Sequence, residues 1–243
     1  MPNTEKSYRD RQGKAQTLID TTPGFSPAYA PADTTVSFTN FNSYLGGVDA
    51  ANTLVETLEV NYTNNANARI AMVKSIREAT TQAVSYVKSN KAWSTQFKAV
   101  KMVADKLRNM RPPEKAAPPP APPPGGEPPA MTAKRNKGEQ AYVELQAHLG
   151  SLITALNACP GYVPPSPAIT LNAFNGLLSP FRGLNTFIGQ LTGQLTTARE
   201  ARRQLYYVGA DCLECKFQAV KNAVKGQYGQ NSTAYGAVKS RKW

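Results

Sequence analysis

A proline-rich segment constrains this chain more than any other feature. From Arg111 to Ala130 the sequence reads RPPEKAAPPPAPPPGGEPPA, which holds 10 of the 19 prolines. Proline fixes φ and lacks a backbone N–H, so neither a helix nor a central strand forms at that density. We therefore predict a Pro-rich basic linker over residues 111–137, extended as polyproline II. It separates an N-terminal half, 1–110, from a C-terminal half, 138–243.

The two halves repeat one another in sequence. Three blocks recur in the same order on both sides of the linker: Pro23-Gly24-Phe25 with Pro160-Gly161-Tyr162, Val36 to Leu45 with Ile169 to Leu178, and Ser94 to Lys101 with Ser232 to Lys239. Repeated blocks in a preserved order indicate a tandem duplication.

Apolar residues recur at helical spacing in both halves. The first set contains Phe41, Tyr44, Leu45, Val48, Ala51, Val55 and Leu58, and its counterpart contains Phe174, Leu177, Leu178, Phe181, Leu184, Ile188 and Leu191. A second set follows in each half, and a polar turn such as Asn61 to Asn67 would join the two helices of a hairpin. The expected fold is all-α, with two duplicated antiparallel helical hairpins that resemble a four-helix bundle. The sequence leaves open whether the hairpins pack on each other or on copies of themselves.

Positive charge is concentrated in the second helix and tail of each half. The chain has 28 Lys and Arg against 16 Asp and Glu, a net charge of +12. Residues 69–111 carry ten basic residues against two carboxylates, and residues 199–242 carry nine against three. The candidate contacts for a polyanion or another partner are Arg69, Lys74, Arg77, Lys88, Lys91, Lys98, Lys101, Arg199, Arg202, Arg203, Lys221, Lys225 and Lys239.

This layout supports two functions. The interpretation ranked first is a structural or interaction protein that self-assembles, in which the acidic or neutral first helix of one copy meets the basic second helix of another. The alternative is binding of nucleic acid or another polyanion, because clustered Lys and Arg release counterions from phosphates. Nearby aromatic residues either stack on unpaired bases or anchor the terminal segments, and we favour the anchoring role: Trp93, Phe97, Tyr228, Tyr235 and Trp243.

A repeated Ser-Thr-x-aromatic-x-Ala-Val-Lys motif closes each half. Its residues are Ser94, Phe97 and Lys101 in the first half, and Ser232, Tyr235 and Lys239 in the second. The serines are good N-caps for a short terminal helix whose aromatic residue folds back, whereas a repeated Ser-Thr and Lys could also form a phosphate or partner contact. The Gly229-x-x-Ser232-x-x-Tyr235 segment resembles the ends of uncharacterised bacterial helical proteins. That resemblance implies helices and supplies no function.

The pair Cys212-Leu213-Glu214-Cys215 is the one ligand-like spacing in the chain. A tetrahedral zinc site needs two more ligands, for which only His148 and Cys159 remain. A thioredoxin-like redox role needs the pair at a helix start, whereas the apolar pattern places it within a helix. We therefore expect no metal, no cofactor and buried or half-buried cysteines.

The remaining features predict a protein without catalytic activity. The chain has a single histidine, no glycine-rich phosphate loop and no paired carboxylates repeated between the halves. Three cysteines are an odd count, and neither an apolar leader nor a long apolar run occurs. These observations predict a soluble, cytoplasmic location.

Overall fold

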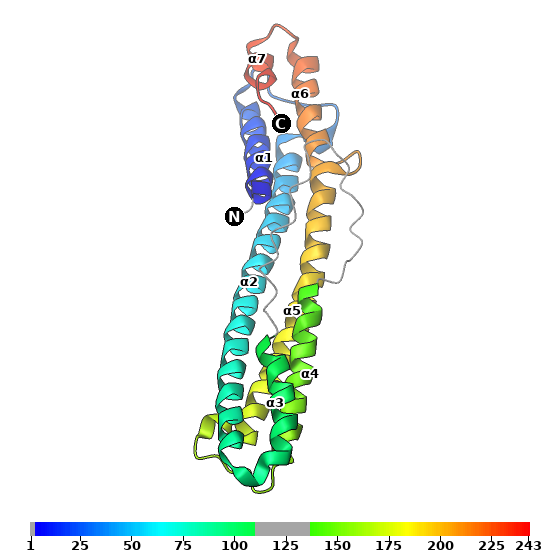
Figure 1. Ribbon diagram of the computed structural model, residues 1–243. Helices are drawn as coiled ribbons and strands as arrows, with labels where there is room; N and C mark the ends of the chain where they lie inside the picture. Colours follow the sequence, from blue (N-terminus) through cyan, green and yellow to red (C-terminus); the bar gives the residue numbers. More distant parts are fainter. Residues whose placement is uncertain (1–2, 110–136) are drawn as a thin grey trace. The chain divides into compact units, whose positions relative to one another are not determined.

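The computed structural model describes residues 3–109 and 137–243. Over these ranges the chain forms seven α-helices, four single-turn 3-10 helices and no strand, so the predicted all-α class is confirmed. The predicted linker, 111–137, lies outside the described residues except for Lys137. In chain order the α-helices are α1 (Asn3–Ile19), α2 (Phe38–Ser89), α3 (Ser94–Asn109), α4 (Lys137–Asn157), α5 (Leu171–Tyr207), α6 (Leu213–Tyr228) and α7 (Thr233–Lys239) (Figure 1).

The chain divides into two compact units, and each unit combines parts of both predicted halves. Unit 1 consists of Met1–Val60 and Gly193–Trp243, and unit 2 consists of Asn61–Thr192. Helix α2 therefore passes from unit 1 into unit 2, and α5 passes from unit 2 into unit 1. The domain boundaries predicted from the sequence fall at the linker between the two halves. Each compact unit instead combines the start of one half with the end of the other.

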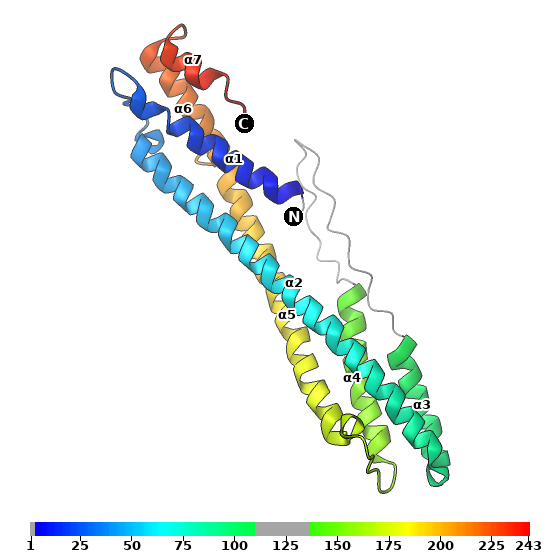
Figure 2. The same cartoon turned by 90° about the vertical axis from the view of Figure 1, so that its left-hand side faces the viewer.

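Unit 2 packs four helical segments around one core: the second part of α2, α3, α4 and the first part of α5. Helix α3 lies beside α4 (Figures 1 and 2). Arg77 on α2 donates from Nε to the carbonyl oxygen of Leu107 on α3 at 3.3 Å. Because burying apolar surface is the main favourable term in folding, the core depends on all four segments, which contribute among others Ile76, Leu107, Leu152 and Phe174.

Unit 1 packs α1, the first part of α2, the last part of α5, α6 and α7 around a second core. Helix α6 packs against both α1 and α7. The fully buried side chains of this core include Leu18, Phe41, Tyr206, Phe217 and Val238.

Both long helices, α2 and α5, begin with the same local structure. A 3-10 turn precedes each helix, Thr34–Val36 (η2) before α2 and Pro167–Ile169 (η4) before α5. The side-chain oxygen of Ser37 accepts a hydrogen bond from the backbone N–H three residues later at 3.4 Å, and that of Thr170 does the same at 3.1 Å. Both residues thus satisfy a backbone donor that the helix itself leaves unpaired.

A tyrosine ahead of each turn makes the same hydrogen bond. The hydroxyl of Tyr29 donates to the carbonyl oxygen of Val36 at 3.2 Å, and that of Tyr162 donates to the carbonyl oxygen of Ile169 at 2.8 Å. The same number of residues separates Tyr29 from Tyr162 as separates Val36 from Ile169. Tyr29 and Tyr162 thus occupy equivalent positions ahead of the long helices, whereas the Pro-Gly motifs align Tyr162 with Phe25.

The turn predicted at Asn61 to Asn67 is wrong, because these residues lie within α2, a single helix of 52 residues. The segment contains neither glycine nor proline, and asparagine or threonine in a helix costs only about 0.5 kcal/mol relative to alanine. The first half does turn back on itself between α2 and α3, through the 3-10 helix Lys91–Trp93 (η3). Asn90 caps η3 by accepting the backbone N–H of Ala92 at 3.0 Å.

The second half also lacks the predicted hairpin of two long helices. Helix α5 ends at Tyr207, α6 begins at Leu213, and the break between them includes Gly209 with φ +86°, a conformation that favours glycine. Helix α6 continues away from α5 in both views (Figures 1 and 2). The chain folds back between α6 and α7, as it does between α2 and α3.

Candidate functional site

Two of the predicted contact residues are buried arginines at equivalent positions of the halves. Arg69 on α2 is 4% exposed, and Arg202 on α5 is 3% exposed. The guanidinium carbon of Arg69 lies 3.7 Å from the ring centroid of Tyr142, and that of Arg202 lies 4.0 Å from that of Tyr8. Each cation–π contact joins one half of the chain to the other. These two arginines therefore belong to the cores of the units and not to the surface.

An asparagine–glutamine pair repeats in the same way. The Asn52 amide donates to the side-chain oxygen of Gln12 at 2.8 Å in unit 1, and the Asn185 amide donates to that of Gln146 at 3.2 Å in unit 2. Polar groups away from water need such partners because desolvation is costly. The two pairs fix the register of α2 against α1 and of α5 against α4.

The three carboxylates on the first part of α2 are neutralised within unit 1. Arg9 on α1 contacts Asp49 and donates to the two carboxylate oxygens of Glu56 at 2.8 and 2.9 Å, while Arg199 on α5 pairs with Glu59 at 2.7 Å. The hydrogen bond from Arg9 holds the pKa of Glu56 below its usual value. Of these contacts, only that of Arg199 with Glu59 joins α2 to a basic segment predicted from the sequence, and it does so within one chain.

Some of the other predicted basic residues have a hydrogen-bond or ion-pair partner within the chain, and others form no ion pair with a described residue. Those with a partner are Arg77 on Leu107, Arg203 on Glu200, Lys74 on Glu78, Lys101 on Asp105 and Lys221 on the carbonyl oxygen of Arg241. Within the described ranges, no ion pair forms at the exposed Lys88, Lys91, Lys98, Lys225 and Lys239.

Four exposed lysines surround the turn between α2 and α3, and we call Lys88, Lys91, Lys98 and Lys101 the lysine cluster. Residues 79–104, which include this turn, and residues 145–192, which include the segment that contacts it, contain no Asp or Glu. The cluster therefore forms a local excess of positive charge, apart from the contact of Lys101 with Asp105.

Neighbouring segments hold the turn of the lysine cluster in place. The indole N–H of Trp93 donates to the carbonyl oxygen of Pro160 at 3.0 Å, and the hydroxyl of Tyr86 donates to that of Val163 at 2.9 Å. The rings of Trp93 and Tyr86 lie 5.6 Å apart in an edge-to-face arrangement. The lysines thus project from a packed turn, which limits how far their backbone can move.

The capping role predicted for the terminal motif is confirmed in one half and wrong in the other. The Ser232 hydroxyl accepts the backbone N–H of Tyr235 at 3.1 Å, so Ser232 is the N-cap of α7. Ser94 has helical dihedral angles, φ −55° and ψ −33°, and is already the first residue of α3. The difference arises because η3 precedes α3 and takes its own cap from Asn90.

The aromatic residues considered for base stacking pack on the cores instead. Phe97 contacts the core of unit 2 and Tyr235 that of unit 1, as the anchoring interpretation predicts. Trp93 is buried, and the Trp243 ring lies 5.3 Å from that of Phe217. Tyr228 likewise packs on unit 1.

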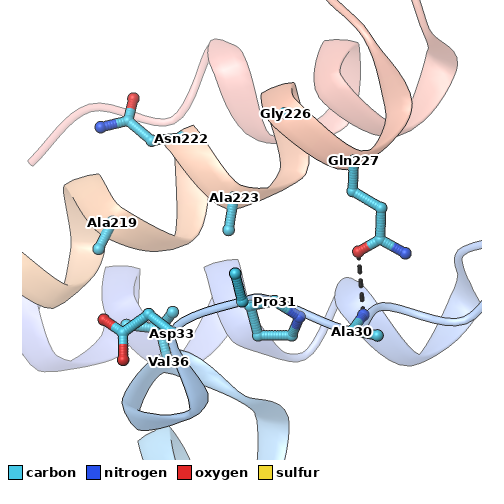
Figure 3. A pocket seen from close by; sticks show the side chains of 10 residues that line it. Ala30, Pro31, Asp33, Val36, Ala219, Asn222, Ala223, Gly226 and Gln227 are labelled. Carbon is cyan, nitrogen blue, oxygen red and sulfur yellow. Dashed lines mark hydrogen bonds between the residues drawn. The ribbon is translucent and has the colours of Figure 1, made fainter.

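A surface hollow of about 570 Å³ lies between residues 30–36 and α6 (Figure 3). The backbone N–H of Ala30 donates to the side-chain oxygen of Gln227 at 2.9 Å beside it. Asp33 is the one charged side chain in its wall, which otherwise carries small groups such as Pro31 and Ala223. These groups do not form a nucleophile with a base or a set of convergent donors.

The Cys-x-x-Cys pair lies at the start of a helix. The sequence pattern places it within a helix, and that prediction is wrong. Cys212 is the N-cap of α6, and its sulfur accepts the backbone N–H of Cys215 at 3.2 Å. The two Sγ atoms are 2.7 Å apart, with Cys212 buried and Cys215 exposed. Sequence reasoning missed this because the break before α6 has no counterpart in the continuous α2.

The other two residues considered for zinc belong to a different unit from the cysteine pair. His148 and Cys159 belong to unit 2, and the cysteine pair belongs to unit 1. In the part of the chain that the structure describes, no three His, Cys, Asp or Glu side chains gather as a metal ion would require.

Comparison with known proteins places no further constraint on the site. None of the described helices combines the length and the apolar character that a membrane crossing needs. No family model, curated protein or solved structure matches this chain.

Proposed function

We propose that this protein is a non-enzymatic nucleic-acid-binding protein that contacts the phosphate backbone through the lysine cluster. The observation that carries the proposal is the exposure of Lys88, Lys91 and Lys98 within residues 79–104, a stretch that holds no Asp or Glu. Cations without nearby anions displace condensed counterions from a polyphosphate, and the affinity gained in this way falls as salt rises.

Contact with the phosphate backbone of a nucleic acid fits the lysine cluster better than recognition of individual bases does. The aromatic residues nearest to the cluster, Trp93 and Phe97, pack into the core of unit 2 and leave no exposed stacking platform for unpaired bases. Phosphate contacts position a protein without reading sequence. The proposed ligand is therefore a nucleic-acid duplex, bound without sequence preference.

Removing the cluster's charge tests this proposal. The triple variant Lys88→Ala, Lys91→Ala, Lys98→Ala is expected to bind a labelled DNA duplex roughly tenfold more weakly at low salt. The slope of log affinity against log salt is expected to fall by about two to three, because up to three phosphate contacts are lost. Fluorescence anisotropy over a salt series measures both quantities.

The matched control removes the same charge from unit 1. Lys225→Ala, Lys239→Ala, Lys242→Ala is expected to leave the affinity and the salt slope almost unchanged. Equal losses in the two triple variants would reduce the binding to net charge alone and contradict the assignment to the cluster. Absence of duplex binding at low salt, or binding only to vesicles that contain phosphatidylserine, would also overturn it.

Self-association is a second candidate, favoured by a different observation. Large apolar side chains are exposed at equivalent positions of the two halves, Leu54 on α2 at 52% and Phe187 on α5 at 44%. A duplicated chain therefore presents two related apolar sites, which is what repeated contacts between copies require. Charge complementarity no longer supports this candidate, since the carboxylates of α2 pair within unit 1.

Light scattering at low and high salt tests self-association. If Leu54 and Phe187 hold copies together, the mass of the wild-type protein rises with concentration, and Leu54→Ser with Phe187→Ser lowers it to that of one chain. Burial of such side chains is apolar, so high salt should not dissociate the assembly. A wild-type protein that stays monomeric at micromolar concentration would remove this candidate.

A further inference from the structure

The thiol pair at the start of α6 has no part in the proposed function. Cys212 and Cys215 belong to unit 1, whereas the lysine cluster belongs to unit 2. The thiol of Cys215 also donates to the carbonyl oxygen of Gly209 at 3.5 Å, across the break between α5 and α6. Both sulfurs are therefore held in a defined local geometry.

We propose that Cys212 and Cys215 form a reversible intramolecular disulfide by exchange with low-molecular-weight disulfides such as glutathione disulfide. Their contact at 2.7 Å, with two residues between them at a helix start, places both sulfurs within reach of one bond after a small side-chain movement. Reactive cysteines occur at helix N-termini and beside cations, because both stabilise the thiolate.

A basic residue follows the thiol pair in sequence. Lys216 is buried, and its ammonium group donates to the Asp211 carboxylate at 2.8 Å. It lies one residue beyond Cys215, in the first turn of α6. Asp211 immediately precedes Cys212. In sequence, the thiol pair thus lies between the exposed Asp211 and the buried Lys216, which pair with each other, at the positive end of the helix.

The two sulfurs have different roles in the exchange. Cys215 is exposed, so its thiolate meets the oxidant. Cys212 is buried and its sulfur contacts that of Cys215, which makes Cys212 the resolving thiol. Once the glutathione sulfur is attached to Cys215, the sulfur of Cys212 attacks from inside the protein.

The reaction balances in two steps. The Cys215 thiolate attacks one sulfur of glutathione disulfide, which forms a mixed disulfide and releases one glutathione thiolate. The Cys212 thiolate then attacks Sγ of Cys215, forms the intramolecular disulfide and releases the second glutathione. The protein loses two protons and two electrons, and glutathione disulfide takes them up as two molecules of glutathione.

The second step is expected to be fast because the resolving sulfur is already adjacent. Intramolecular attack by a positioned group has a large advantage over attack by a free thiol. The mixed disulfide should therefore not accumulate in the wild-type protein.

Mass spectrometry of the full chain tests the proposal. The protein is incubated in buffers of graded glutathione and glutathione disulfide, quenched with acid and alkylated. The oxidised protein is expected to be lighter by about 2 Da before alkylation. The loss should map to the tryptic peptide Gln204–Lys216, which carries both cysteines, while Cys159 in the peptide Gly138–Arg182 stays free to alkylate.

Serine variants separate the two roles and keep the helix cap. Cys212→Ser retains a side-chain oxygen that can cap α6 and leaves the exposed Cys215, so it should trap a glutathione adduct of about 305 Da. Cys215→Ser should form neither the adduct nor the disulfide at the same ratios, and Cys159→Ser should behave as the wild-type protein does. A stable adduct on wild-type Cys215, or oxidation of Cys159 at the same ratio, would overturn the assignment.

Discussion

At the scale of single residues, the two tyrosines that precede the long helices make the same hydrogen bond in different surroundings. Tyr162 is 9% exposed and donates at 2.8 Å, whereas Tyr29 is half-buried and donates at 3.2 Å. A hydrogen bond is worth more where water cannot replace the lost partner. The two tyrosines therefore allow a buried hydrogen bond to be compared with a more solvent-exposed one in the same chain.

Replacing each tyrosine by phenylalanine measures that difference. Tyr162→Phe is expected to lower the free energy of unfolding by about 1 to 2 kcal/mol, and Tyr29→Phe by about 0.5 kcal/mol. Urea unfolding of the full chain provides the values, with the slope of each transition serving as a check on cooperativity. The opposite order of the two losses would contradict the larger contribution expected of the buried hydrogen bond.

Residue type predicted which side chains are buried better than it predicted what they contact. Phe41 and Phe174 are buried as their spacing indicates. Arg69 and Arg202 were assigned to the surface by their charge, yet both stack on tyrosines of the other half. The tyrosine that stacks on each arginine lies far away in sequence, so no local pattern reveals it.

At the scale of elements, the helical periodicity predicted the long helices but not where they end. Polar residues from Asn61 to Asn67 indicated a turn, although asparagine on a solvated helix surface costs little. The break before α6 carried a usable signal, since Gly209 lies inside the second apolar set, between Tyr206 and Leu213, and adopts a positive φ. Weighting glycine above polarity would have placed both boundaries and would have moved the cysteine pair to a helix start.

Hydrophobic periodicity indicates which face of a helix is buried and not which helix covers it. The apolar faces of α2 and α5 were predicted correctly, and the partners were assigned within each half because neighbours in sequence are usually neighbours in space. In each unit the start of one half packs with the end of the other half. Three-dimensional information was needed to see that exchange, and with it the pairing of the α2 carboxylates inside unit 1.

At the scale of the whole molecule, the two units predict that the halves stay together without a covalent link. Each core contains buried side chains from both halves, such as Ile76 with Leu152 in unit 2 and Phe41 with Phe217 in unit 1. A protease site placed in the linker, residues 111–137, should yield two fragments that co-elute in size-exclusion chromatography. Burial of apolar surface between them supplies the free energy.

The cut protein also has a clear control. Urea above the unfolding transition should separate the fragments, and its removal should restore the joint peak in a concentration-dependent way, because the association has become bimolecular. Separation of the fragments under native conditions would contradict the exchange of segments between the halves.

The exchange of segments also determines how the sequences of the two halves can change. Arg69 in one half packs on Tyr142 in the other, so the effect of a substitution at Tyr142 depends on the residue at position 69. Arg202 depends on Tyr8 in the same way. Compensating substitutions should therefore pair a position in one half with a position in the other, and one half alone could complete these cores only by associating with a second molecule.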